Sequence, residues 1–95
     1  MFENIYKFVK TIPVGKIMTY GQVAKILGIK DTRKIGWALH ANKSSEVPCH
    51  RVLNKEGRLA KNFAFEGEVE QQRRLEVEGI VFTKDLYVDL EKYGM

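Results

Sequence analysis

The residue types that could do nucleophilic chemistry lie in one short stretch, residues 47–52, with the sequence Val-Pro-Cys-His-Arg-Val. Cys49 is the only cysteine of the 95 residues, and His50 beside it is one of two histidines. An imidazole near a thiol can raise the fraction of thiolate, which is the form that attacks an electrophile. A single cysteine in a small domain is, however, more often a buried and inert apolar residue. Both interpretations stay open at this point.

Pro48 restricts the backbone that carries this pair. Its ring fixes its own φ and favours an extended Val47, so we expect Cys49 to lie on a stiff loop rather than on a helix. Side chains of neighbouring residues on an extended chain point to opposite faces. If the chain stays extended, Cys49 and His50 therefore need a turn or a bridging water between them.

Composition excludes several classes of protein. The length predicts a single domain over residues 1–95. One cysteine excludes an intramolecular disulfide, and with two histidines we expect no metal site and no cofactor. No apolar run approaches the roughly 20 residues that span a bilayer, and the start Met-Phe-Glu-Asn lacks the basic residues of a signal peptide. We expect a cytoplasmic, nucleoid-associated protein without membrane contact.

Charge is distributed unevenly along the chain. Residues 1–61 carry 12 Lys and Arg against 4 Asp and Glu, whereas residues 62–95 carry 4 against 8. The Cys-His pair lies in the basic part. A positive surface beside a reactive residue suits a polyanionic partner, nucleic acid above all. Small domains are often mildly basic, so charge alone decides nothing.

Periodicity and capping signals predict the elements that position this stretch. Apolar spacing predicts a helix over residues 3–11. Thr19 and Gln22 form a capping box for a second helix, which Gly28 ends. Asp31 or Thr32 caps a third helix over residues 32–41. The second and third helices form a helix-turn-helix, whose second helix would meet DNA.

The remainder predicts a small wing and a further helix. Residues 52–53 and 58–59 form a hairpin, with Gly57 at the position that needs a positive φ. Residues 61–67 are a loop, and residues 68–78 form a polar helix anchored by Val69, Leu75 and Val77. Residues 81–82 and 87–90 are short extended segments. The fold class predicted is mainly α with a small β-hairpin, a winged helix-turn-helix-like single domain.

Three linked pieces of sequence carry a family resemblance. They are the motif Pro-Cys-His-Arg-Val at 48–52, the segments Ile-Pro-Val-Gly-Lys at 12–16 and Thr-Tyr-Gly-Gln-Val-Ala at 19–24, and Arg-Lys-Ile-Gly at 33–36 ahead of Asn42. Together they resemble the DNA-binding and active-site domain of the O6-alkylguanine-DNA alkyltransferases over about residues 2–79. Residues 80–95 are then a C-terminal extension. In that family a cysteine takes the alkyl group from O6 of guanine in double-stranded DNA and keeps it.

The resemblance implies a role for each matching residue. Cys49 would be the alkyl acceptor, His50 its base through a water, and Glu78 the carboxylate behind the histidine. Asn42 would orient the active-site loop. The implied DNA contacts are Arg33 as the finger that replaces a flipped guanine, Tyr20 at the target phosphate and guanine ring, and Lys34, Thr19, Gln22 and Arg51. The resemblance further implies docking in the minor groove, with little sequence preference.

Two alternatives to a single-turnover methyltransferase stay open. Residues 61–67 lack the hydroxyl side chains of the family's loop, and the short chain resembles the alkyltransferase-like proteins, which bind O6-alkylguanine without repairing it and recruit nucleotide excision repair proteins. Those relatives typically lack the cysteine that this chain has at 49. The second alternative is a winged-helix regulator without chemistry, which predicts sequence-specific binding as a dimer. No segment suggests a dimerisation helix, so we expect a monomer.

Overall fold

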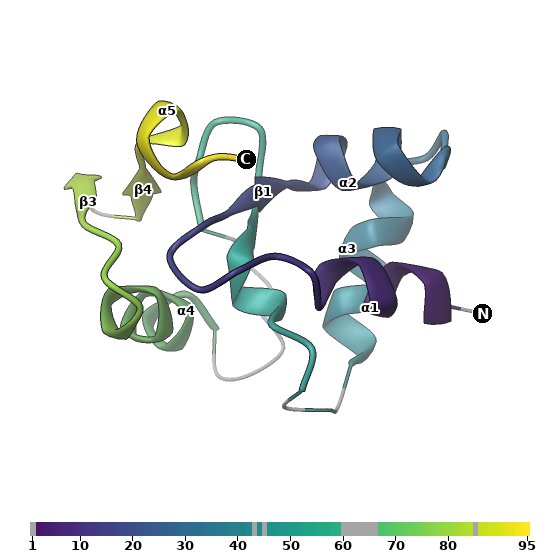
Figure 1. Ribbon diagram of the computed structural model, residues 1–95, viewed down its shortest axis with the longest axis horizontal. Helices are drawn as coiled ribbons and strands as arrows, with labels where there is room; N and C mark the ends of the chain where they lie inside the picture. Colours follow the sequence, from purple (N-terminus) through teal and green to yellow (C-terminus); the bar gives the residue numbers. More distant parts are fainter. Residues whose placement is uncertain (1, 43, 45, 60–66, 85) are drawn as a thin grey trace.

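Helices dominate the architecture, as predicted. The computed structural model describes residues 2–42, 44, 46–59, 67–84 and 86–95 (Figure 1). In chain order the elements are α1 (Glu3–Val9), β1 (Met18–Thr19), α2 (Tyr20–Leu27), α3 (Arg33–Ala41), the 3-10 helix η1 (Cys49–Arg51), β2 (Val52–Leu53), α4 (Gly67–Val77), β3 (Phe82–Lys84), β4 (Tyr87–Val88) and α5 (Leu90–Tyr93). The predicted loop at 61–67 lies outside the described residues, except for Gly67, which begins α4.

The first three helices pack together on one side of the molecule, and α4, β3, β4 and α5 lie on the other (Figure 1). The capping box predicted for α2 is present: the Thr19 hydroxyl accepts from the Gln22 N–H, and the Gln22 side chain accepts from the Thr19 N–H. Gly28 ends α2 in the left-handed conformation, with φ of 71°. The predicted helix-turn-helix of α2 and α3 is therefore confirmed.

Asp31 provides the cap at the start of α3. Its carboxylate oxygen Oδ1 accepts from the Arg33 N–H at 3.1 Å, whereas the Thr32 side chain makes no capping bond. Ile35, Ala38 and Leu39 are buried, as their spacing predicted. The opposite face of α3 is left on the surface.

The predicted hairpin wing is wrong in its strand pairing. Val52–Leu53 pair with Met18–Thr19 in a parallel ladder, and Arg58 pairs with Tyr87 instead. Both side chains of β2 are fully buried, which a wing with one solvent face could not provide. The turn itself is as predicted, since Gly57 has φ of 82° and its N–H donates to the Asn54 carbonyl.

The two paired strands separate two clusters of buried side chains. Met18 and Val52 belong to the cluster that α1, α2 and α3 cover. Ile17 and Leu53 belong to the second cluster, with Leu75 of α4. Side chains alternate along extended chain, so β2 contributes one side chain to each cluster, and Met18 of β1 and Ile17 just before it do the same. We call these the first and the second core.

Two further predictions in the C-terminal third need correction. Val69 and Val77 do not anchor α4, because they are 80% and 76% exposed. Leu75 and the polar Gln71, both 0% exposed, face the second core one turn apart. The predicted extended segment at 87–90 ends at Val88, because Asp89 accepts from two N–H groups and caps α5, which begins at Leu90.

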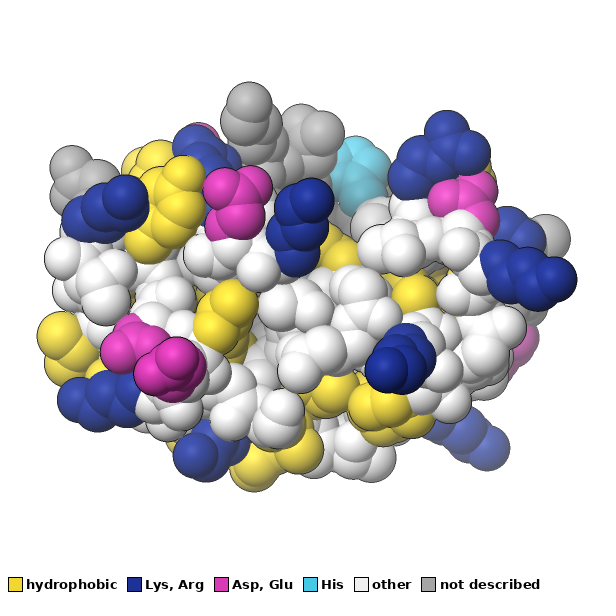
Figure 2. Space-filling view, turned by 90° about the horizontal axis from the view of Figure 1, so that it is seen from above, with side chains coloured by type: hydrophobic (Ala, Val, Ile, Leu, Met, Phe, Trp, Pro, Cys, Tyr) yellow, Lys and Arg dark blue, Asp and Glu magenta, His cyan; other side chains and the backbone are white. Residues whose placement is uncertain are grey.

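The last residues of the chain pack against β1. Gly94 forms a parallel bridge with Ile17, and the Gln22 side chain donates to the Met95 carbonyl at 3.3 Å. Across the described residues, no helix has the length and apolar character that a membrane crossing requires. Figure 2 shows Lys and Arg side chains at separate points over the part of the surface that carries α1 to α3.

Candidate active site

Cys49 lies in one turn of 3-10 helix, and not in the extended loop that the sequence predicted. The Arg51 N–H donates to the Pro48 carbonyl at 3.0 Å, which closes the turn η1. Pro48 needs no N–H of its own at such a helix start. With about three residues per turn, successive side chains point in three directions. The turn therefore sends Cys49 toward the first core and His50 away from it.

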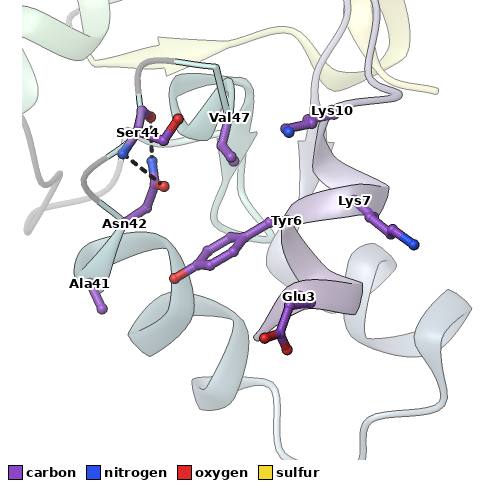
Figure 3. Close-up of a pocket in the computed structure, with 8 residues that line it drawn as sticks. All are labelled: Glu3, Tyr6, Lys7, Lys10, Ala41, Asn42, Ser44 and Val47. Atoms are coloured by element: carbon purple, nitrogen blue, oxygen red, sulfur yellow. Dashed lines mark hydrogen bonds between the residues drawn. The ribbon is translucent and has the colours of Figure 1, made fainter. Parts of the chain in front are cut away.

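The Cys49 thiol is held by groups from α3 and its C-cap. Its side chain is almost fully buried, and Asn42 Nδ2 donates to Sγ at 3.2 Å. The thiol itself donates to the Leu39 carbonyl at 3.8 Å. Asn42 is fixed in turn, since it donates to the Ser44 carbonyl and accepts from the Ser44 N–H (Figure 3). The structure thus brings together the predicted pair Asn42 and Cys49.

Asn42 also borders a hollow of about 460 Å³, which lies between α1 and the residues Ala41, Ser44 and Val47 (Figure 3). The Tyr6 ring reaches across from α1, and its hydroxyl donates to the Ala38 carbonyl at 2.7 Å. Lys7 and Lys10 line the α1 side. Asn42 therefore lines this hollow and also donates to the Cys49 thiol.

Burial keeps the thiol protonated. Desolvation raises the pKa of Cys49, and the Asn42 hydrogen bond and the positive charge of Arg74 lower it by less. The resting group is therefore a thiol at neutral pH, and a base is required to form the nucleophile.

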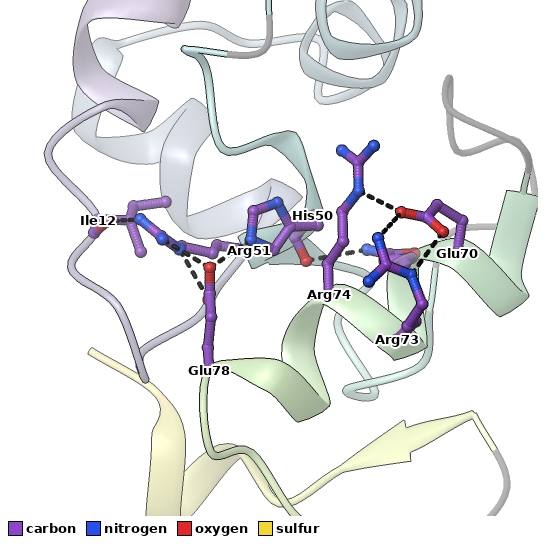
Figure 4. Close-up of polar contacts among 8 residues, drawn as sticks. Ile12, His50, Arg51, Glu70, Arg73, Arg74 and Glu78 are labelled. Carbon is purple, nitrogen blue, oxygen red and sulfur yellow. Dashed lines mark hydrogen bonds and ion pairs between the residues drawn. The ribbon is translucent and has the colours of Figure 1, made fainter.

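His50, Glu78 and Arg51 form one network behind the thiol. His50 Nε2 lies 2.7 Å from Glu78 Oε2, and Arg51 donates to both oxygens of the same carboxylate at 2.9 and 2.7 Å (Figure 4). A further Arg51 nitrogen donates to the Ile12 carbonyl at 2.7 Å. The predicted residues His50 and Glu78 are therefore in contact. Arg51 is bound to this carboxylate and to the segment after α1, and its predicted DNA contact stays a prediction.

The charges in this network define the tautomer of His50. Desolvation raises the pKa of Glu78, but hydrogen bonds from Arg51 and His50 outweigh it and leave the pKa below its usual value. An ionised Glu78 only accepts, so Nε2 of His50 carries a proton and donates it, which leaves Nδ1 as an acceptor. Burial lowers the pKa of His50 despite Glu78, so the imidazole is neutral at pH 7. A neutral imidazole with a free lone pair is a competent base.

Two functional candidates on α4 were missed by the sequence reasoning. Gln71 donates to the carbonyls of His50 and Val52, at 3.1 and 3.3 Å, and so ties η1 to α4. Arg74 pairs with Glu70, and its charge lowers the pKa of both Cys49 and His50 (Figure 4). They lie seven and four residues before Glu78, which directly follows α4 with its N–H donating to the Arg74 carbonyl, so the three side chains lie on one side of this segment.

Tyr20 begins α2 and is half-buried. Burial, and then the nearby Cys49, raise the pKa of Tyr20 to about 12. Its hydroxyl therefore stays protonated and can donate. The neighbouring Thr19 and Gln22 use their polar side-chain atoms in the capping box, and their predicted DNA contacts stay predictions.

The other predicted DNA-contacting residues lie on the surface of α3. Arg33 and Lys34 are exposed in its first turn, and Trp37 is 55% exposed one turn later. The Leu39 carbonyl on the buried side of the same helix contacts Cys49. One short helix thus connects the exposed basic face to the thiol.

Comparisons with known proteins agree with this arrangement. Residues 1–80 match the family described as 6-O-methylguanine DNA methyltransferase, DNA binding domain. Alkyltransferase-like protein 1 of Schizosaccharomyces pombe is 38% identical over 81 residues, which are 83% of this chain and 75% of that protein. A methylated-DNA–protein-cysteine methyltransferase of Shigella flexneri is 41% identical over 59 residues, which are 60% of this chain and 34% of that protein.

A solved structure extends the similarity over the whole fold. The crystal structure of S. pombe Atl1 in complex with damaged DNA containing O6-carboxymethylguanine superposes with a TM-score of 0.85 and 34% identity. The match covers 99% of this chain and 93% of that one, so it includes the C-terminal elements β3, β4 and α5.

Proposed function

Because the chain belongs to the family of the 6-O-methylguanine DNA methyltransferase DNA-binding domain, we propose that it binds double-stranded DNA carrying O6-alkylguanine and transfers the alkyl group to Cys49. The observation that carries the proposal is the Cys49 thiol, held by Asn42 at 3.2 Å and followed directly by the His50–Glu78 pair. A nucleophile, its orienting amide and a base with a fixed tautomer are what such a transfer needs.

The transfer requires one new bond, one broken bond and three proton transfers. His50 Nδ1 takes the thiol proton through a water, and the thiolate sulfur attacks the alkyl carbon. An S–C bond forms as the bond from carbon to O6 breaks, and its electron pair goes to O6. Tyr20 donates a proton to the guanine and regains one from His50 through solvent. The thiol proton thus ends on the guanine, and the protein keeps a thioether.

The target nucleotide has to leave the base stack before this chemistry. O6 of a stacked guanine cannot reach a buried sulfur, and extrusion costs a few kcal/mol. Arg33 at the start of α3 fills the vacated place in the duplex, which offsets part of that cost, and its charge attracts phosphates. Lys34 beside it adds a second basic group on the same exposed turn.

The mass of the intact protein tests the transfer. After mixing with a duplex that contains one O6-methylguanine, we expect a gain of one methyl group in every active molecule. Cys49→Ala should stay unchanged, as should the wild type with undamaged DNA. A wild type that binds the lesion duplex but keeps its mass would contradict the transferase proposal.

A lesion sensor without chemistry is the second candidate. The sequence similarity to alkyltransferase-like protein 1 of S. pombe over 83% of this chain, against 60% for the methyltransferase of S. flexneri, favours it. The high pKa of Cys49 also suits a thiol that stays protonated in a bound complex. In that case the complex with lesion DNA would persist and present a surface to nucleotide excision repair proteins. Tighter binding to the lesion duplex, without a mass change, is its expected signature.

A further inference from the structure

Arg33 makes two hydrogen bonds to one neighbouring carboxylate. Its Nε donates to Asp31 Oδ1 and its Nη2 to Asp31 Oδ2, both at 3.0 Å. The hydrogen bond from Arg33 lowers the pKa of Asp31, so this carboxylate is ionised at neutral pH. This two-point contact fixes the plane of the guanidinium.

Trp37 covers the same guanidinium from the next turn of α3. The Arg33 Cζ atom lies 5.6 Å from the centre of the indole ring, within the range of a cation–π contact. Asp31 lies two residues before Arg33 and Trp37 four residues after it. These two contacts hold the guanidinium beside α3, although the Arg33 side chain is 77% exposed.

A side chain that fills a gap in a base stack must extend away from its helix. We propose that Asp31 and Trp37 are positioning residues, which hold Arg33 against α3 in the free protein and release it to the duplex. This inference rests on the proposed role of Arg33 in DNA binding. An exposed ion pair and an exposed cation–π contact hold their partners weakly, so DNA phosphates can compete for the guanidinium.

Asp31→Asn removes the bond from Nη2 and the negative charge, and it keeps the oxygen that caps α3 and accepts from Nε. The Asn side-chain oxygen still accepts from the Arg33 N–H, and Asn caps helices as well as Asp does. The oxygen that pairs with Nη2 is replaced by an NH₂ group, and the charge is lost. Glu76→Gln, on the exposed surface of α4, is the matched control for the change of net charge.

The free protein provides the first readout, without DNA. Trp37 is the only tryptophan, so the indole N–H gives one signal in a ¹⁵N spectrum. We expect the guanidinium N–H groups of Arg33, those of Nη2 above all, to exchange more slowly with water in the wild type than in Asp31→Asn, and the indole signal to shift. Equal exchange rates and unshifted indole signals in both proteins would show that Asp31 does not hold Arg33 in solution.

Binding to an undamaged duplex provides the second readout. We expect Asp31→Asn to bind about two- to fivefold more tightly than Glu76→Gln, because no contact to Asp31 has to be broken. When Arg33 is already replaced by Ala, Asp31→Asn should change the affinity for DNA by no more than Glu76→Gln changes it. Weaker binding by Asp31→Asn, or an equal gain in the Arg33→Ala background, would overturn the proposal.

The two proposals fail in different ways. If Arg33→Ala binds O6-methylguanine DNA as tightly as the wild type, Arg33 is no finger and the proposed DNA-binding mode fails, whatever Asp31 does. If Arg33→Ala loses affinity while Asp31→Asn binds DNA with the same affinity as Glu76→Gln, the role of Arg33 in the duplex is supported and the positioning role of Asp31 is wrong.

Discussion

At the scale of single residues, Glu78 is the group on which the site depends. One carboxylate accepts from Arg51 at both oxygens and from His50 at one of them. It therefore fixes the tautomer of the base and also ties the 3-10 turn to the end of α4. Loss of this carboxylate would leave the His50 imidazole and the Arg51 guanidinium without their acceptor. Both side chains are largely buried, so the loss destabilises the folded state.

We expect Glu78→Gln to lower the free energy of unfolding by about 2–3 kcal/mol at pH 7. The folded-state pKa of Glu78 lies below 4.5, so its contribution is complete above pH 4.5 and is lost as the pH falls through the lower folded value. The difference in free energy of unfolding between Glu78→Gln and the wild type should therefore become smaller below pH 4.5. Urea unfolding at several pH values measures it.

Glu76→Gln serves as the control for this measurement as well. Its side chain is exposed on α4, and removal of an exposed charge changes stability by about 0.5 kcal/mol at most. A stability loss in Glu78→Gln that is equal at pH 4 and pH 7 would mean that packing, and not the ionised carboxylate, is responsible.

Two of the contacts in the site could be predicted, because the resemblance of the motifs to the alkyltransferase family implied them. Cys49 with Asn42, and His50 with Glu78, are in contact as expected. The contacts of Arg51 and Arg33 could not be predicted in this way. Both are long and flexible cations. The acid that Arg51 contacts lies 27 residues away, whereas Arg33 contacts an acid two residues away, for which its flexible side chain offers several other orientations.

At the scale of elements, the residues that cap helices predicted the helix ends correctly, whereas the pairing of the strands was predicted wrongly. Thr19, Gln22 and Gly28 follow local rules of capping, which hold wherever a helix begins or ends. The partner of β2 is set by which strand can bury both sides of it, and that strand lies 34 positions earlier in the chain. A hairpin prediction considers only neighbours in sequence and misses this pairing.

Two glycines give opposite expectations for the same substitution. Gly57 has φ of 82°, and a Cβ there would lie 2.4 Å from the Val88 carbonyl oxygen. We expect Gly57→Ala to destabilise the protein by about 2–4 kcal/mol. At Gly36, inside α3, an added Cβ meets nothing within 4 Å, and Gly36→Ala should stabilise by about 0.5–1 kcal/mol.

Thermal unfolding of both variants beside the wild type checks the pair. The melting temperature should fall for Gly57→Ala and rise for Gly36→Ala. Shifts in the same direction would show that the turn at 54–58 relaxes more easily than its hydrogen bonds indicate, or that α3 is strained at Gly36.

At the scale of the whole molecule, the charge asymmetry predicts how DNA binding responds to salt. Residues 1–61 carry 12 basic against 4 acidic residues and include α1, α2 and α3. If three or four phosphates are neutralised, affinity for an undamaged duplex should fall about 40- to 150-fold between 50 and 200 mM salt. Fluorescence anisotropy of a labelled duplex measures this slope.

The preference for lesion DNA should respond differently. Extrusion of the base and filling of the gap involve few ions, so the ratio of affinities for lesion and plain duplexes should change little over the same range of salt. A ratio that disappears at 200 mM would mean that phosphate attraction, and not recognition of a flipped base, causes the preference.

The position of the site between the two cores links its geometry to folding cooperativity. Cys49 packs in the first core, whereas Glu78 follows α4, whose Leu75 packs in the second, and Arg51 with Gln71 spans them. Local opening of either core breaks the relay from carboxylate to thiol. Amide hydrogen exchange should therefore place α3 and α4 in one cooperative unit, and a half-unfolded molecule would keep a cysteine but lose its base.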